Sequence, residues 1–247
     1  MRKYVLFILF VGTILVVPGC LDDDEGYSLG KMWIGFGMVE QISDDPLEYE
    51  INMDDGDVLV PVASGYHLPW YYYGSHDPES RLKTGDRILL NYTILDEDDD
   101  AGNGAGRYYV RVNSVKRVLL KGILDLTGEN QDSIGNDPVI VEEVWQTDSL
   151  LNFKIRYWGR YEIHYINLVK DPVQPGTGEN QPIDLQLRHN DNGDPKDIRY
   201  TAFVSFHLGA LQVEELDSVQ FRVTSTDYDG ELFGYEGVYH YGDGSGS

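Results

Sequence analysis

The sequence predicts an all-β protein in which a small OB-like barrel is followed by an antiparallel β-sandwich. Runs of alternating apolar and polar residues, typical of half-buried strands, recur at 87–95, 108–112, 151–157, 183–187 and 219–223. Clusters of Asp, Asn and Gly, which favour turns, separate these runs. Beyond the first twenty residues, no window of helix length repeats its apolar residues with a period of 3.6.

The expected strands divide the chain into two domains. About five or six strands are expected within residues 30–124, the size of a small closed barrel. About seven or eight are expected within residues 139–241, the size of a sandwich. Residues 125–138 are polar, rich in Gly and Asn and closed by Pro138, so they are the predicted linker. Residues 242–247 are expected to be a flexible tail.

Residues 1–19 are predicted to be a cleaved lipoprotein signal peptide. Arg2 and Lys3 provide a positive start, and the apolar run 4–17 is shorter than the roughly 20 residues of a spanning helix. Gly19 then precedes Cys20, the single cysteine of the chain. This junction resembles a bacterial lipobox, in which the cysteine becomes the diacylated first residue. Several acyl chains anchor more firmly than one, so we expect membrane contact through a lipid on Cys20.

Residues 20–29 form an expected acidic tether, with four consecutive acids at 22–25. A cysteine followed closely by acids resembles the export signal that sends lipoproteins of Bacteroidetes to the outer face of the outer membrane. We therefore expect a lipid-anchored outer-membrane protein that faces the cell exterior. The inner leaflet is the alternative.

The mature chain is strongly acidic. Without Arg2 and Lys3 it has 17 basic and 42 acidic side chains, a formal net charge of −25. This charge argues against a nucleic-acid partner, because such binding requires Lys and Arg to neutralise phosphates. Once Cys20 is acylated, no thiol is left for a disulfide or a cysteine-based metal site. No cofactor is expected.

Several short motifs together resemble the NigD-like lipoproteins of Bacteroidetes. They are GYSLGKMW (26–33), LVPVAS (59–64), KTGDR (83–87) leading into NYT (91–93), DSIGNDP (132–138), LRHN (187–190) and FVSF (203–206). The resemblance covers the whole chain and implies an N-terminal OB-like barrel joined to a C-terminal β-sandwich. The family name comes from association with a bacteriocin gene cluster, and the resemblance supplies no biochemical activity.

Four consecutive aromatic residues, Trp70, Tyr71, Tyr72 and Tyr73, are candidates for ligand stacking. Side chains alternate along an extended chain, so these rings cannot all face one core. Exposed rings on a loop would form a platform for a sugar or a peptide. Alternatively, the loop covers the barrel end or the domain interface.

Two acidic loops are weak candidates for a calcium site. One contains Asp96, Asp98 and Asp100, and the other contains Asp191 and Asp194. Both collect the oxygen ligands that calcium prefers, but neither has the spacing of a helix–loop–helix site. Solvated hairpin loops are the alternative interpretation.

Three serines are candidates for O-glycosylation. Ser133, Ser149 and Ser218 each follow an aspartate and precede an aliphatic residue. This triplet resembles the acceptor sequence of O-glycosylation in Bacteroidetes.

The sequence does not indicate a catalytic site. Ser64 lacks the flanking glycines of a nucleophile elbow. The histidines, at 67, 76, 164, 189, 207 and 240, are scattered and lack the spacing of a zinc pair on one helix. We therefore predict a non-enzymatic binding module for a glycan, a peptide or an envelope partner. The alternative, which rests on the family resemblance, is a bacteriocin-associated immunity or protective role.

Overall fold

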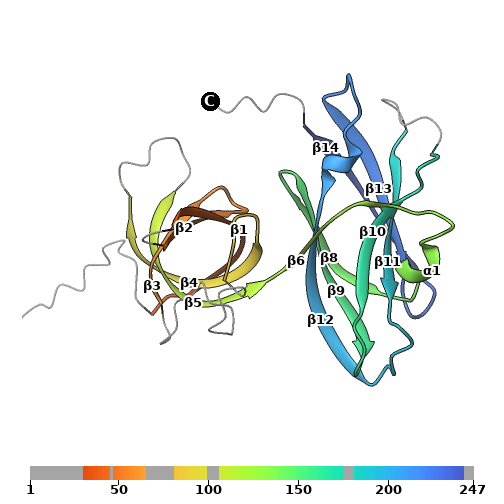
Figure 1. The fold of residues 1–247 in the computed structure, drawn as a ribbon, viewed down its shortest axis with the longest axis horizontal. Helices are drawn as coiled ribbons and strands as arrows, with labels where there is room; N and C mark the ends of the chain where they lie inside the picture. Colours follow the sequence, from red (N-terminus) through yellow and green to blue (C-terminus); the bar gives the residue numbers. More distant parts are fainter. Residues whose placement is uncertain (1–29, 45–46, 65–80, 99–105, 175–180, 242–247) are drawn as a thin grey trace, which may run out of the picture.

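The computed structural model describes residues 30–44, 47–64, 81–98, 106–174 and 181–241. Cys20, Asp100 and the aromatic run 70–73 lie outside the described residues, as do the predicted signal peptide and tail. Figure 1 shows a closed barrel beside two packed sheets, which confirms the all-β prediction. In the part of the chain that is described, no helix has the length and apolar character to cross a bilayer.

The N-terminal domain is a five-stranded closed barrel with the strand order β1-β2-β3-β5-β4. Its strands are β1 (Trp33–Asp44), β2 (Leu47–Met53), β3 (Val58–Ser64), β4 (Arg87–Glu97) and β5 (Arg107–Arg117). Strands β3 and β5 run parallel, whereas the other neighbours are antiparallel. This is the small Greek-key barrel that the OB-like prediction requires. Alternation along the strands places Ile51, Leu59, Ile88, Leu90 and Val110 inside, with no exposed area.

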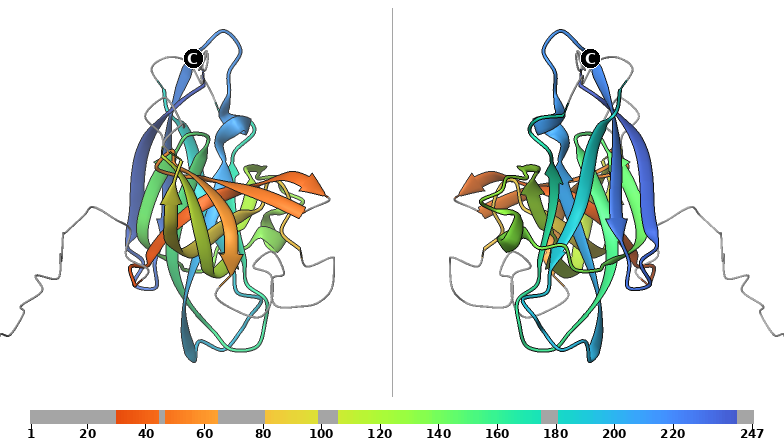
Figure 2. Two further views of the ribbon diagram at one scale, coloured as in Figure 1. Left: turned by 90° about the vertical axis from the view of Figure 1, so that its left-hand side faces the viewer. Right: turned by 90° about the vertical axis from the view of Figure 1, so that its right-hand side faces the viewer.

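The C-terminal domain is a sandwich of two sheets, with the strand orders β14-β13-β11-β10-β7 and β6-β12-β9-β8. Its strands are β6 (Leu119–Gly122), β7 (Leu124–Asp125), β8 (Ile140–Thr147), β9 (Leu150–Gly159), β10 (Tyr165–Lys170), β11 (Ile183–Asn190), β12 (Ile198–His207), β13 (Ser218–Thr226) and β14 (Leu232–His240). A short helix, α1 (Gln131–Ile134), and a 3-10 turn, η2 (Leu208–Leu211), complete it. The two views of Figure 2 show the sandwich extending above and below the barrel.

The sheets of the sandwich are mixed rather than purely antiparallel. β7 pairs with β10, β6 with β12 and β11 with β13 in parallel, while the remaining pairs are antiparallel. The alternating runs 151–157, 183–187 and 219–223 lie within β9, β11 and β13. Alternation is the same for either strand direction, so it carried no information on parallel or antiparallel pairing.

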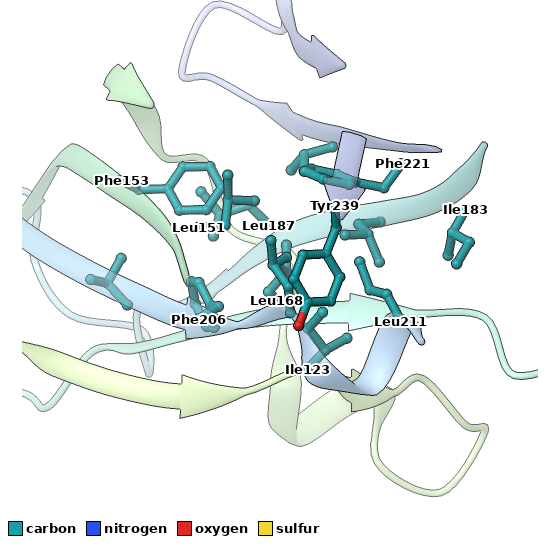
Figure 3. Close-up of a cluster of buried hydrophobic side chains, with 14 of the residues drawn as sticks. Ile123, Leu151, Phe153, Leu168, Ile183, Leu187, Phe206, Leu211, Phe221 and Tyr239 are labelled. Carbon is teal, nitrogen blue, oxygen red and sulfur yellow. The ribbon is translucent and has the colours of Figure 1, made fainter. Parts of the chain in front are cut away.

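Both sheets contribute to one hydrophobic core, which Figure 3 shows. Phe153 of β9 and Phe206 of β12 meet edge to face, with ring centroids 5.9 Å apart. Leu168 and Phe221 approach from the opposite sheet and are almost completely buried. Side chains of this size supply most of the free energy that holds two sheets together.

The chain enters the sandwich earlier than the sequence predicted. β5 ends at Arg117, and β6 and β7 already belong to the sheets of the sandwich. The predicted linker 125–138 therefore lies inside the sandwich, where α1 buries Ile134. Polar, glycine-rich composition is shared by linkers and by hydrogen-bonded turns, so composition alone placed the boundary too late.

A polar contact joins the two domains. Arg87, at the start of β4, has a fully buried side chain that binds both carboxylate oxygens of Asp54. Its Nη2 also donates to Asn152 Oδ1 in the sandwich at 3.1 Å. Ser205 Oγ donates to the same oxygen at 2.6 Å. The two terminal nitrogens of the guanidinium thus bind acceptors from both domains.

Three aromatic rings pack beside this contact. Phe36 of the barrel lies 5.2 Å from Trp145 and 5.1 Å from Phe203, both of which belong to the sandwich. The guanidinium of Arg87 lies over the Phe36 ring at 5.4 Å. Partly buried rings and the buried guanidinium of Arg87 thus connect the barrel to the sandwich.

Candidate functional site

The candidate site lies at the lower end of the sandwich in Figure 1, where β9 ends and β12 begins. The β9–β10 connection (160–164) and the β11–β12 connection (191–197) meet there. Gly159 allows them to approach, because a Cβ at this position would lie 2.5 Å from His164 Nε2 and 2.7 Å from Asp194 Oδ2.

Four aromatic rings form a column that runs from the surface into the sandwich. Tyr200 is half exposed and stacks on Tyr157, with centroids 5.7 Å apart and planes 27° apart. Tyr157 packs on His164 at 4.7 Å. His164 in turn stacks on the fully buried His189 at 5.0 Å. Rings that support one another in this way keep their orientation without a ligand.

The two histidines form a series of three hydrogen bonds. His164 Nε2 lies 3.1 Å from Asp194 Oδ2, and His164 Nδ1 lies 2.8 Å from His189 Nε2. At the far end, His189 Nδ1 lies 2.8 Å from the carbonyl oxygen of Pro138. Every ring nitrogen of the pair is therefore engaged.

The partners at the two ends of this series assign two of the donors. The Pro138 carbonyl and the ionised Asp194 carboxylate can only accept hydrogen bonds, so His189 Nδ1 and His164 Nε2 are the donors. His164 Nδ1 and His189 Nε2 then face each other at the centre of the series.

Asp194 anchors the β9–β10 connection. Its buried carboxylate accepts the backbone N–H groups of Arg160 and of Tyr161, the latter at 3.0 Å. Burial would raise the pKa of this carboxyl, but the hydrogen bonds from Tyr161, Arg160 and His164 outweigh burial and lower the pKa to about 2. The carboxylate thus stays ionised and holds the connection in place.

An open pocket of about 360 Å³ lies above the histidine pair. It is lined by Tyr157, Arg160, Tyr161, Glu162, Ile163, His164, Asp194 and Tyr200. The side chains of Tyr161 and Ile163 are 72% and 68% exposed at its rim. Arg160 lies over the ring of Tyr161 at 4.8 Å and binds Asp197 at 2.7 Å. We call this the tyrosine pocket.

Two of the family-like motifs meet behind the tyrosine pocket. The backbone N–H of Asp137 donates to His189 O at 2.8 Å, and Asn190 Nδ2 donates to Ser133 O at 2.8 Å. Gly135 adopts φ +73° and ψ −179°, a conformation that is essentially restricted to glycine. DSIGNDP and LRHN therefore form one hydrogen-bonded unit that fixes His189.

The calcium candidates are placed in two separate loops. Asp191 is buried, and its carboxylate accepts Gly193 N–H at 2.8 Å and lies 3.8 Å from Lys196 Nζ. Among residues 30–44, 47–64, 81–98, 106–174 and 181–241, no group of three or more His, Cys, Asp or Glu is placed to hold a metal.

In the other acidic loop, Asp96 Oδ1 accepts the backbone N–H of Glu97, and Asp98 Oδ2 lies 3.4 Å from Arg107 Nε. Both carboxylates already have protein partners. Asp100, the third candidate of this loop, lies outside the described residues.

The three serines occupy different settings. Ser133 is exposed on α1, and its hydroxyl donates to Asn130 O at 2.9 Å. Ser149 is half-buried in the turn between β8 and β9, and Ser218 is the half-buried first residue of β13. Ser133 is thus the most accessible, and O-glycosylation at all three stays a prediction.

Sequence reasoning missed the histidine pair. His164 and His189 are 25 positions apart, and they meet because β10 and β11 pair as neighbours. No spacing rule within one helix or strand would have linked them. The signal that was present is their position, with His164 just before β10 and His189 near the end of β11.

We expect stability to fall as the pH drops below about 6.5. Burial lowers the pKa of His189, and the nearby charge of His164 acts in the same direction. The Pro138 carbonyl and the carboxylates of Asp137 and Asp191 oppose this shift without cancelling it. Unfolded histidine takes up a proton near pH 6.5, whereas folded His189 resists protonation, so acid favours the unfolded chain.

Urea unfolding measured between pH 7.5 and pH 5 would reveal this loss as a falling midpoint. The variant His189→Gln should have a flatter profile, and exchange of the exposed His240 for Gln should leave the profile unchanged. Asp194 adds a second loss between about pH 4 and pH 2, because its folded pKa lies below its unfolded value. An equal slope in His189→Gln and the parent would contradict the assignment.

These features define a class of two-domain β proteins, in which an OB-like barrel precedes a mixed β-sandwich that carries a pocket at one end. Residues 122–236 match the family described as the NigD-like C-terminal beta sandwich domain. This match covers most of the C-terminal domain, and the predicted resemblance to NigD-like proteins is confirmed.

Solved structures extend the likeness over both domains. A protein described as toxin-related, from Parabacteroides distasonis, is 29% identical with a TM-score of 0.65, over 85% of this chain and 94% of that chain. A NigD-like immunity protein from Bacteroides caccae is 17% identical, with a TM-score of 0.61, over 86% and 99%. A protein described as a lipoprotein, from Bacteroides fragilis, is 12% identical, with a TM-score of 0.54, over 87% and 99%. The last two share the fold. None of the curated proteins matches this chain.

Proposed function

We propose that this chain is a lipid-anchored protein of the outer membrane that faces the cell exterior and binds a ligand without catalysing a reaction. Cys20 provides the anchor, and the tyrosine pocket provides the binding site. The observation that carries the proposal is an aromatic pocket built over a histidine pair with no free ring nitrogen.

The closed histidine pair supports binding rather than catalysis. A general base needs a nitrogen within hydrogen-bond reach of its substrate. Both nitrogens of His164 already bond to Asp194 and His189, and His189 is fully buried.

The envelope location is supported by the sequence before the barrel. Cys20 follows a short apolar run and precedes the acids at 22–25. A lipid anchor at that position would leave both folded domains on one side of the membrane. The Bacteroides fragilis protein that shares this fold is also described as a lipoprotein.

Cell fractionation tests the location. Exchange of Cys20 for Ala should move the protein from the membrane to the soluble fraction, and the parent should be cleaved by protease added to intact cells. Neutralising the acids at 22–25 should protect it from protease without releasing it, whereas neutralising Asp227 and Asp229 should change neither result. Membrane association that survives loss of Cys20, or a protected parent, would contradict the proposal.

An immunity-type or protective role is the second hypothesis. It is supported by the description of the Parabacteroides distasonis relative as toxin-related and by the NigD-like family of the sandwich. It also requires a binding surface, so the tyrosine pocket would serve this role as well.

A further inference from the structure

The size of the tyrosine pocket limits its ligand. Pockets for small molecules usually measure roughly 300–1,000 Å³. At about 360 Å³, the tyrosine pocket has room for one or two rings and not for a long polymer. An extended ligand would therefore present only a terminal or side unit to it.

Contacts within the protein hold parts of the pocket wall in place. Tyr157 is held between Tyr200 and His164 by stacking. The backbone that carries Tyr161 is held by Asp194. A ligand therefore does not have to order these groups, which lowers the entropic cost of binding.

The charge and polarity of the pocket further limit the chemical class of its ligand. The mature net charge of −25 repels anions at long range. Arg160 is paired with Asp197 and does not create a cationic patch, while Glu162 adds an acceptor at the rim. The rim thus offers both donors and acceptors around apolar ring faces. A neutral molecule with an apolar face and a hydroxylated edge matches this arrangement.

We propose that the tyrosine pocket binds a pyranose unit of a neutral glycan. This inference rests on the proposed function and names the ligand of that same site. The apolar face of the sugar stacks on Tyr200 or Tyr161, and its hydroxyl groups bond to Arg160 and Glu162. The buried pair of His164 and His189 acts as a positioning element that keeps Tyr157 in place.

A peptide is the alternative ligand, and it would bind through different contacts. β12 is paired along Val204–His207 with β6, while its earlier part is paired with β9 alone among the described strands. A peptide strand added there would bind through backbone hydrogen bonds and depend little on the Tyr200 ring.

Binding to immobilised neutral oligosaccharides, followed by calorimetry with each sugar retained, tests the proposal. Tyr161→Ala and Tyr200→Ala should each weaken binding by about tenfold. Tyr200→Phe keeps the ring and should bind within about threefold of the parent. Tyr165→Ala is the matched control, because Tyr165 is 46% exposed at the start of β10 but does not line the pocket.

Two results would overturn the inference. One is that the parent binds none of the immobilised sugars more strongly than the Tyr161→Ala, Tyr200→Ala double variant does. The other is capture of a peptide through these same tyrosines, which would remove the sugar but leave the binding function standing. The fractionation of the Cys20→Ala protein is independent of both results, so failure of the location can be recognised separately.

Discussion

Replacing Asp54 with alanine should lower the free energy of unfolding by about 3–5 kcal/mol, the usual cost of leaving one partner of a buried ion pair alone. Asp54 binds both terminal nitrogens of Arg87, whose side chain has no exposed area. Without that carboxylate, Asn152 is the one side chain of the described segments that still accepts a hydrogen bond from the guanidinium. Urea or guanidinium unfolding, followed by the near-ultraviolet signal of the aromatic contacts, would measure the loss.

A more exposed pair in the same barrel is the control. Glu50 and Arg107 form an ion pair at 2.5 Å with side chains 24% and 31% exposed. Glu50→Ala should cost less than about 1 kcal/mol, because solvent screens such pairs. The double variant Asp54→Leu, Arg87→Met removes both charges and should recover most of the loss. Equal costs for Asp54→Ala and Glu50→Ala would show that burial does not govern the Arg87 contact.

Gly135→Ala should destabilise the sandwich by about 3 kcal/mol, which combines a forbidden backbone conformation with overpacking. At φ +73° and ψ −179° an L side chain is strained. Its Cβ would also lie 2.8 Å from His189 O and 2.9 Å from Asn190 Cα, which are backbone atoms that cannot rotate away. Chemical unfolding would give the magnitude, and the resonances of His189 would report the local disturbance.

Substitutions at two other glycines separate the cost of backbone strain from the cost of overpacking. Gly193 has φ +72° but open space around its Cβ position, so Gly193→Ala should show only the cost of strain. Gly128 has open space and no left-handed φ, and its exchange for Ala should be nearly neutral. If Gly135→Ala costs no more than Gly193→Ala, the close packing of the two motifs does not contribute.

Local patterns predicted much of the fold. The runs at 87–95, 151–157 and 219–223 lie within β4, β9 and β13 because alternation is a property of neighbouring residues. Such patterns do not reveal the direction of a strand relative to its neighbours, so the parallel pairs were missed. The boundary was misplaced because a hydrogen-bonded turn at 125–138 has the composition of a linker.

The binding site was less predictable than the fold. The aromatic run 70–73 was the leading candidate from sequence, and it lies outside the described residues. The tyrosine pocket instead collects rings from β9, β12 and the connection between β9 and β10. Tyr157, Tyr161 and Tyr200 are individually ordinary in the sequence, since single tyrosines are common on strands.

The sequence by itself determined the β class, the strands that contain the alternating runs, the acidic character and the predicted anchor at Cys20. All of these depend on composition or on residues within about ten positions of one another. The tertiary structure decided which distant groups form hydrogen bonds or ion pairs. Arg87 meets Asp54 across 33 positions and Asn152 across 65, and His164 meets His189 across 25. Such contacts depend on strand order and register, which arise only when the sheets assemble.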